Sequence, residues 1–178
     1  MGDDKFFEVV FPLFYTDNVK NIIVGLNSSK LCTLPYPNHL KGCPNFNKRS
    51  NCPTKCLDFK KTVDVDKEML LVGVRYDFGG HIKKMRTAHP DWTDRQLECC
   101  LYWQGKVRKH LRIWADKNIK NGMEIYDTPE AMGVNVTGTM RNLGLKIEWP
   151  PKKYVWKVAV LGYPIKMEKN NELLFDLC

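Results

Sequence analysis

The sequence of 178 residues contains no apolar run of the length that crosses a membrane. Its first residues, Met1 to Lys5, are acidic and are followed by only a short apolar stretch, which is not the pattern of a secretory signal. Internal repeats and low-complexity tracts are absent too. We therefore expect a soluble chain in the cytoplasm that does not use a membrane.

Three common catalytic signatures are also missing. The sequence has no glycine-rich phosphate loop, no Gly-x-Ser-x-Gly nucleophile elbow and no His-Glu-x-x-His pair. These absences argue against P-loop nucleotide hydrolases, serine hydrolases of the α/β class and helix-borne zinc proteases.

The composition is that of a globular protein, with 43% apolar and 27% charged residues. A length of 178 residues favours one domain over residues 1–178. The cysteines number seven, which is an odd count, and no export signal accompanies them. A disulfide framework is therefore disfavoured, and metal binding or thiol chemistry is favoured.

A cysteine-rich segment at residues 31–61 is the part of the sequence that ordinary packing explains least. Core cysteines usually lie among aliphatic residues. Here the thiols lie among Pro, Asn, Lys and Arg, and four prolines break any regular structure. A long irregular segment inside a domain is uncommon unless it is functional. We predict an irregular metal-binding loop whose thiolate ligands are Cys32, Cys43, Cys52 and Cys56.

The spacing Cys43-x8-Cys52-x3-Cys56 matches none of the compact zinc or ferredoxin patterns. Three thiolates on one loop need a fourth ligand, and we expect Cys32 because a local ligand costs little loop-closure entropy. Cys99 is the alternative on the following helix, and His39 and Cys100 are further candidates. Four thiolates suit either zinc or a [4Fe–4S] cluster, and the spacing does not choose between them.

The net charge of +8 is concentrated in two places. Residues 41–61 carry six Lys or Arg against one Asp, and residues 81–120 carry ten against four acids. Such surfaces suit nucleic acid, a nucleotide or an acidic protein partner, although a solvated basic surface has equal weight. Aromatic residues Trp92, Tyr102 and Trp103 lie nearby in the sequence, and the predicted contacts are Lys106, Arg108, Lys109 and Arg112. An Arg112–Asp116 ion pair is an alternative role for Arg112.

The apolar patterns predict α+β architecture with a mostly antiparallel sheet. The longest helix is expected over residues 93–118, opened by a capping box at Thr93 and Gln96, with Cys100 on its apolar stripe. A turn is expected at Gly79-Gly80 and a helix capped by Asp17. The remaining predicted elements are strands at 6–14, 69–76 and 154–161 and helices at 129–132 and 136–143.

Two segments resemble a family of predicted metal-binding proteins of unknown function. Residues 43–53 are similar to its C-P-x-Y-G-K-x-x-x-C-P-P signature, and residues 129–145 are similar to its later P-S-x-E-A-x-G-I-D-V segment. The resemblance implies a cysteine-bound metal of the iron–sulfur kind at Cys43 and Cys52, with no established reaction. The family's second cysteine group is absent between Gln104 and Asp127, where a basic helix is expected instead.

From residues and resemblance together we expect one metal centre, [4Fe–4S] in preference to zinc. It would serve redox or sulfur chemistry on a nucleotide or RNA substrate. The alternative is a non-catalytic module in which zinc or a cluster holds the loop together. In that case the basic helix binds nucleic acid or an acidic protein partner.

Overall fold

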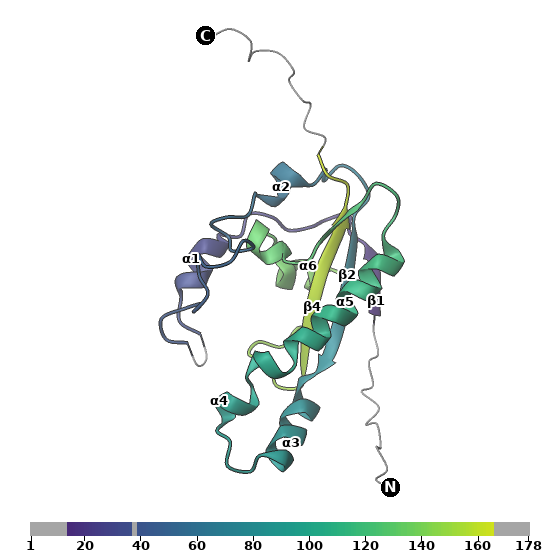
Figure 1. The fold of residues 1–178 in the computed structure, drawn as a ribbon. Coiled ribbons are helices and arrows are strands. Elements are labelled where there is room, and N and C mark those ends of the chain that lie inside the picture. The colour runs from purple at the N-terminus through teal and green to yellow at the C-terminus, as the bar shows by residue number, and fades with distance from the viewer. Residues whose placement is uncertain (1–13, 37–38, 166–178) are drawn as a thin grey trace, which may run out of the picture.

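The computed structural model of the chain describes residues 14–36 and 39–165 (Figure 1). A four-stranded antiparallel sheet forms its centre, in the order β1–β2–β4–β3. The predicted α+β class with an antiparallel sheet is confirmed. The strands are β1 Phe14–Asn18, β2 Leu70–Asp77, β3 Glu124–Tyr126 and β4 Tyr154–Gly162.

The two central strands, β2 and β4, pair over their whole common length, from Leu70 opposite Leu161 to Asp77 opposite Tyr154. Both strands carry nearly continuous apolar runs, which is the pattern of strands buried on both faces. Successive side chains point to opposite faces of a sheet. Leu70 and Val72 accordingly belong to one buried cluster, whereas Leu71 belongs to another.

Helices cover both faces of the sheet (Figure 1). α5, Gln104–Asn118, packs on β2 and β4 through an apolar stripe of Val107, Leu111 and Ala115 at helical spacing. α6, Val136–Asn142, brings Met140 against the opposite face, beside Leu71. The other helical elements are α1 Ser28–Thr33, α2 Phe59–Thr62, α3 Phe78–Ala88, α4 Asp94–Leu97 and the 3₁₀ turns Cys100–Tyr102 and Pro129–Met132.

Most of the strands and helices predicted from residue 69 onward are confirmed. The strands predicted at 69–76 and 154–161 are β2 and β4, and the helices at 129–132 and 136–143 are present. The capping box is formed too, since Thr93 and Gln96 exchange hydrogen bonds at the start of α4. Within the described ranges, none of the helices combines the length and apolar character that crossing a membrane requires.

The single long helix predicted over residues 93–118 is wrong. It is divided into α4 and α5 by a 3₁₀ turn at Cys100–Tyr102. Leu97 and Trp103 are both buried. Six residues of straight helix turn through about 600°, which would place these two side chains on different faces. The break lets both residues reach the interior, and it leaves Cys100 exposed rather than on the apolar stripe.

The helix predicted from Asp17 is also wrong. Asp17 lies in β1, opposite Leu71 of β2, and residues 19–27 form no helix. Their apolar side chains reach the core from irregular chain, because Val24 forms a bridge with Val134. The strand predicted at 6–14 lies outside the described residues, apart from Phe14 at the start of β1.

Gly79 and Gly80 do not form the predicted turn but lie in the first turn of α3. The side chain of Asp77 caps this helix by accepting a hydrogen bond from the Gly80 N–H at 2.9 Å. A Cβ at Gly80 would lie 2.3 Å from the Asp77 carboxylate, so glycine allows the close approach. The two glycines therefore belong to the start of a helix, and a Gly-Gly pair alone does not predict that role.

Candidate functional site

The cysteine loop, residues 31–61, lies beside the sheet as a separate lobe between α1 and α2 (Figure 1). It has no helix or strand between Leu34 and Asp58 except an isolated bridge of Tyr36 with His39, in the part that is described. Phe59 anchors its end, because this side chain is fully buried in a core cluster. The described chain is irregular between Leu34 and Asp58, whereas the two ends of the predicted range lie in α1 and α2.

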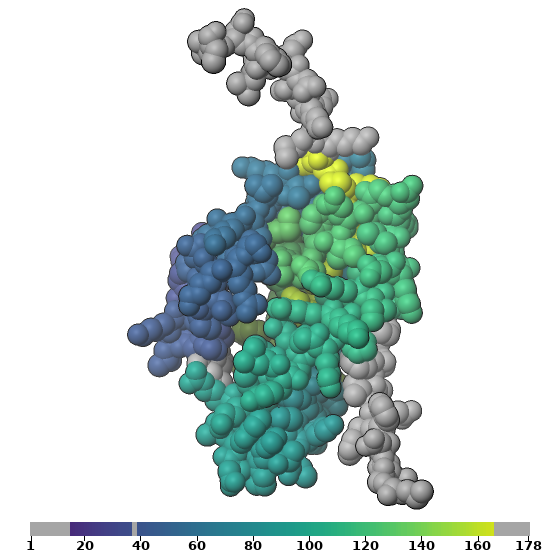
Figure 2. Space-filling view, in the orientation of Figure 1, coloured from purple at the N-terminus to yellow at the C-terminus, as the bar shows by residue number. Residues whose placement is uncertain are grey.

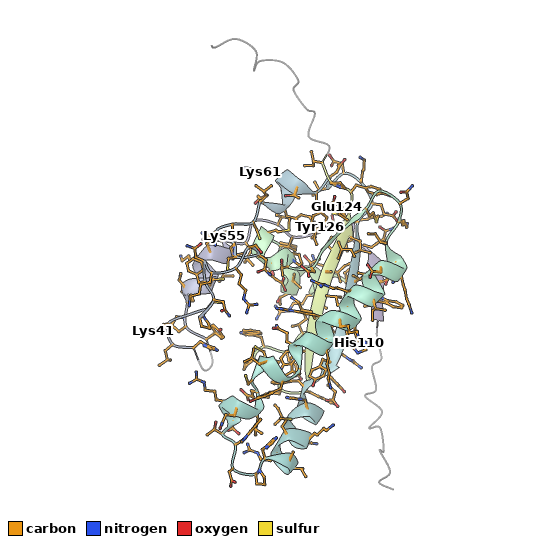
Figure 3. All side chains as sticks on the ribbon, in the orientation of Figure 1. Lys41, Lys55, Lys61, His110, Glu124 and Tyr126 are labelled. Carbon is orange, nitrogen blue, oxygen red and sulfur yellow. The ribbon has the colours of Figure 1, made fainter. Side chains whose placement is uncertain are left out.

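The loop has almost no fully buried side chains. From residue 41 to residue 58 the one buried side chain is Cys52, at 8% exposure. Leu57 is 61% exposed, so the aliphatic residue in this range does not form a core. Charged groups lie along the outside, where Lys41, Lys55 and Lys61 follow the loop from its tip to α2 (Figure 3). Burial of apolar area therefore does little to hold the loop in place.

Cys32 and Cys43 are brought together by the backbone. The Cys43 N–H donates to the Cys32 carbonyl at 2.8 Å. Gly42 permits this contact, since its φ is +77° and a Cβ there would lie 2.5 Å from the Cys32 oxygen. Both thiols are half-buried.

Cys52 lies in a turn that surrounds its sulfur with backbone groups. The Arg49 N–H donates to Sγ at 3.4 Å, and the thiol donates to the Asn45 carbonyl at 3.2 Å. The N–H groups of Arg49, Lys48 and Asn47, that of Arg49 foremost, lower the pKa of the Cys52 thiol. Cys52 is therefore disposed to be a thiolate, which is the form that binds metals.

The four thiols predicted as ligands lie near one another. The pKa of Cys32 is raised by burial and then by the charges of Cys43 and Cys52. The pKa of Cys56 is raised by burial and then by the charge of Cys52, one turn away. Within residues 14–36 and 39–165, however, no three side chains of His, Cys, Asp or Glu converge closely enough to hold one metal ion. The thiols are gathered but not arranged around a common point.

The other candidate ligands differ in position. The ring of His39 packs against the ring of Tyr36, and the two centroids are 4.7 Å apart. Cys99 is half-buried and Cys100 is exposed, just before α5. The pKa of Tyr36 is raised by burial and then by the charges of Cys43, Cys100 and Cys32, which places Cys100 close to the loop. Figure 2 shows a hollow between the cysteine loop and the chain around α4.

The thiolate of Cys52 should appear at a lower pH than an ordinary thiolate, about 8.5. In a pH titration of the metal-free protein followed by thiolate ultraviolet absorbance, we expect one step below that value, because backbone N–H groups stabilise the anion. A folded pKa below the unfolded one stabilises the fold fully above the unfolded pKa, and this contribution is lost as the pH falls through the lowered pKa. The Cys52→Ser variant should lack the early step, and Cys56→Ser should keep it. An early step that survives Cys52→Ser contradicts this assignment.

The predicted basic contacts lie on the outer face of α5, away from its buried stripe of Val107, Leu111 and Ala115. Spacings of three and four residues make Lys109 a neighbour of Lys106, and Arg112 a neighbour of both Lys109 and Arg108, on that face. Arg112 forms an ion pair with Asp127 at 3.3 Å instead of the expected pair with Asp116. Lys109 lies on the exposed outer surface. His110, which Figure 3 labels on the same helix, is half-buried.

A stack of three rings outside the core was not predicted from the sequence. His89 and Trp92 are nearly parallel, with centroids 3.9 Å apart and an interplanar angle of 8°. Tyr102 follows at 5.1 Å from Trp92. Trp103, which sequence proximity had grouped with these residues, is instead buried against Tyr76 at 5.2 Å. The His-Pro-Asp-Trp segment at 89–92 contained a signal for this stack, since a tight turn brings residues three apart together.

No family model, no curated protein and no solved structure matches this chain. The similarity of residues 43–53 and 129–145 to a metal-binding family thus remains at the level of short motifs. The function has to be argued from the site itself.

Proposed function

We propose that the cysteine loop binds a metal centre through the thiolates of Cys32, Cys43, Cys52 and Cys56, and that this centre is a [4Fe–4S] cluster in preference to zinc. The observation that carries the proposal is the loop's interior, where from residue 41 to residue 58 a cysteine is the one buried side chain. A loop without an apolar core needs another source of order, and bound metal is a common one. The reducing cytoplasm would keep these thiols available.

The donor set fits this centre in kind and number. Four thiolates suit soft metals, and Cys52 lies in a turn that favours its anionic form. The side chains are not preformed around one point, so binding has to draw them together, as is usual where metal binding is coupled to folding. We therefore expect metal to order the loop as it binds.

The preference for a cluster over a single ion follows the resemblance of residues 43–53 to the metal-binding signature. Zinc requires four sulfurs about 2.3 Å from one point. A [4Fe–4S] cluster instead takes one cysteine at each of its irons, so the ligands stand further apart. When bound, such a cluster supplies electron-transfer or sulfur chemistry. Cys32, Cys43, Cys52 and Cys56 would hold it, and the Arg49 N–H beside Cys52 would tune it by hydrogen bonding to sulfur.

The composition of the purified protein tests this proposal. Protein purified without oxygen should be brown and should contain about four irons and about four acid-labile sulfides per chain. One zinc per chain in a colourless protein would overturn the cluster assignment but not the thiolate site. Protein from native cells with neither metal, and with no uptake during reconstitution, would overturn the whole proposal.

A further inference from the structure

The stack of His89, Trp92 and Tyr102, here called the aromatic stack, lies in the part of the chain formed by α3, α4 and the turn at Cys100–Tyr102. None of its three rings belongs to the buried hydrophobic clusters of the described residues. Tyr102 is 50% exposed, and its neighbour Leu101 is 84% exposed. The packing of the core does not explain why three rings are arranged in a ladder at the surface.

The aromatic stack is held in place by its surroundings. The Arg86 guanidinium donates to the Trp92 carbonyl at 2.7 Å and forms an ion pair with Asp94 at the start of α4. The Trp92 N–H donates to the His89 carbonyl at 3.1 Å, which closes a turn. The rings are thus fixed before any partner arrives, so little ordering entropy is lost on binding.

The stretch of chain that carries the aromatic stack has an excess of positive charge. Residues 81–112 carry eight Lys or Arg against three acids. Burial and then the charges of Lys84 and Lys106 lower the pKa of His81, so one cation of α3 and one of α5 lie near this side chain. Lys83, Arg95 and Lys106 are exposed, and their side chains form no hydrogen bond or ion pair within the described ranges.

We propose that the aromatic stack and its exposed cations form a binding surface for single-stranded nucleic acid. A base would continue the ladder on Tyr102, and Lys106 with Arg95 would contact phosphates. Stacked rings among cations are the features of single-strand binding, because every unpaired base offers a flat face and every nucleotide a charge. A duplex hides these faces, and an acidic peptide would use the cations without the rings. The surface does not include the cysteine loop, so this proposal does not depend on the metal.

Binding is tested with fluorescent oligouridine RNA of about twelve nucleotides, a length within the range of such sites. Fluorescence anisotropy with the full chain should show binding that weakens steeply with salt. Tyr102→Ala should weaken binding roughly 5- to 150-fold, the range of about 1–3 kcal/mol per stacked base. The matched control Tyr102→Phe keeps the ring and should bind within about twofold of the native chain. Lys106→Ala should reduce the magnitude of the salt slope by about 0.7.

Further probes separate the partners. Oligothymidine DNA of the same length distinguishes RNA from DNA, and binding of either supports the shared stacking chemistry. Equal affinity for a duplex of this length, or equal affinity of Tyr102→Ala and the native chain, would overturn the proposal. Binding of a polyglutamate peptide that competes with the RNA and is unaffected by Tyr102→Ala would also overturn it. Circular dichroism of each variant checks that the fold is retained.

Discussion

Replacing Cys52 with serine is expected to empty the metal site while leaving the sheet and its helices folded. A serine hydroxyl does not ionise near neutral pH, so it cannot replace a thiolate ligand. Altering groups that only support metal ligands already costs about 10- to 100-fold in affinity, so losing a ligand should cost at least that much. Cys52 belongs to none of the buried clusters of the described residues, so the core should survive. Metal analysis and circular dichroism measure the two parts of this prediction.

The same measurement on other cysteines decides the ligand set. Cys32→Ser should lose metal as Cys52→Ser does, because Cys32 lies against Cys43 through the backbone hydrogen bond. Cys99→Ser should keep the full content and serves as the matched control. The opposite result, with metal retained in Cys32→Ser and lost in Cys99→Ser, would show that the site joins the loop to the chain before α5. Metal retained in Cys52→Ser would remove the loop from consideration.

The parts of the fold that could be predicted from sequence are those where local pattern and tertiary position agree. The apolar run of β2 predicts a strand, and pairing with β4 buries it on both faces. The Thr93 capping box works because its hydrogen bonds lie within four residues. The stripe of α5 is set by helical spacing alone. In each case a short window contains the whole physical cause.

The predictions fail where contacts with residues distant in the sequence determine the local structure. Nothing near Leu97 in the sequence indicates that Trp103 also has to be buried, so a regular helical pattern concealed the break between α4 and α5. The segment after Asp17 has helical spacing, but the edge of β2 offers pairing to β1 instead. Gly80 was assigned to a turn because its contact with the Asp77 side chain cannot be recognised from a glycine pair.

The candidate site was likewise predictable only where a short stretch of sequence contains the cause. The composition of residues 31–61 predicted that the thiols would form a group of their own, because it excludes an apolar core. The contact of Cys32 with Cys43 could not be predicted, since it depends on how the backbone closes at Gly42. The stack of His89, Trp92 and Tyr102 was hidden for a similar reason, because Tyr102 joins it through the unpredicted turn before α5.

Gly42→Ala should damage the metal site without removing a thiol. The residue has φ +77°, and an added Cβ would lie 2.5 Å from the Cys32 oxygen and 2.9 Å from the Thr33 carbonyl carbon. Both are backbone atoms, so the segments holding Cys32 and Cys43 have to separate, and the hydrogen bond between them is lost. We expect about 1–2 kcal/mol of backbone strain, a further ~1–3 kcal/mol from overlap, and metal affinity at least ~10-fold lower.

Gly144→Ala is the matched control for this substitution. Gly144 follows the end of α6 with φ +78°, almost the same φ as Gly42, but an added Cβ meets nothing within 4 Å. It should therefore show the strain of about 1–2 kcal/mol in urea unfolding and keep its full metal content. Because the two variants share the strain and differ in the overlap, a metal loss confined to Gly42→Ala assigns the loss to the separation of Cys32 from Cys43. If both variants keep their metal, the close approach at Gly42 does not shape the site, and Cys32 is not a ligand held by that contact.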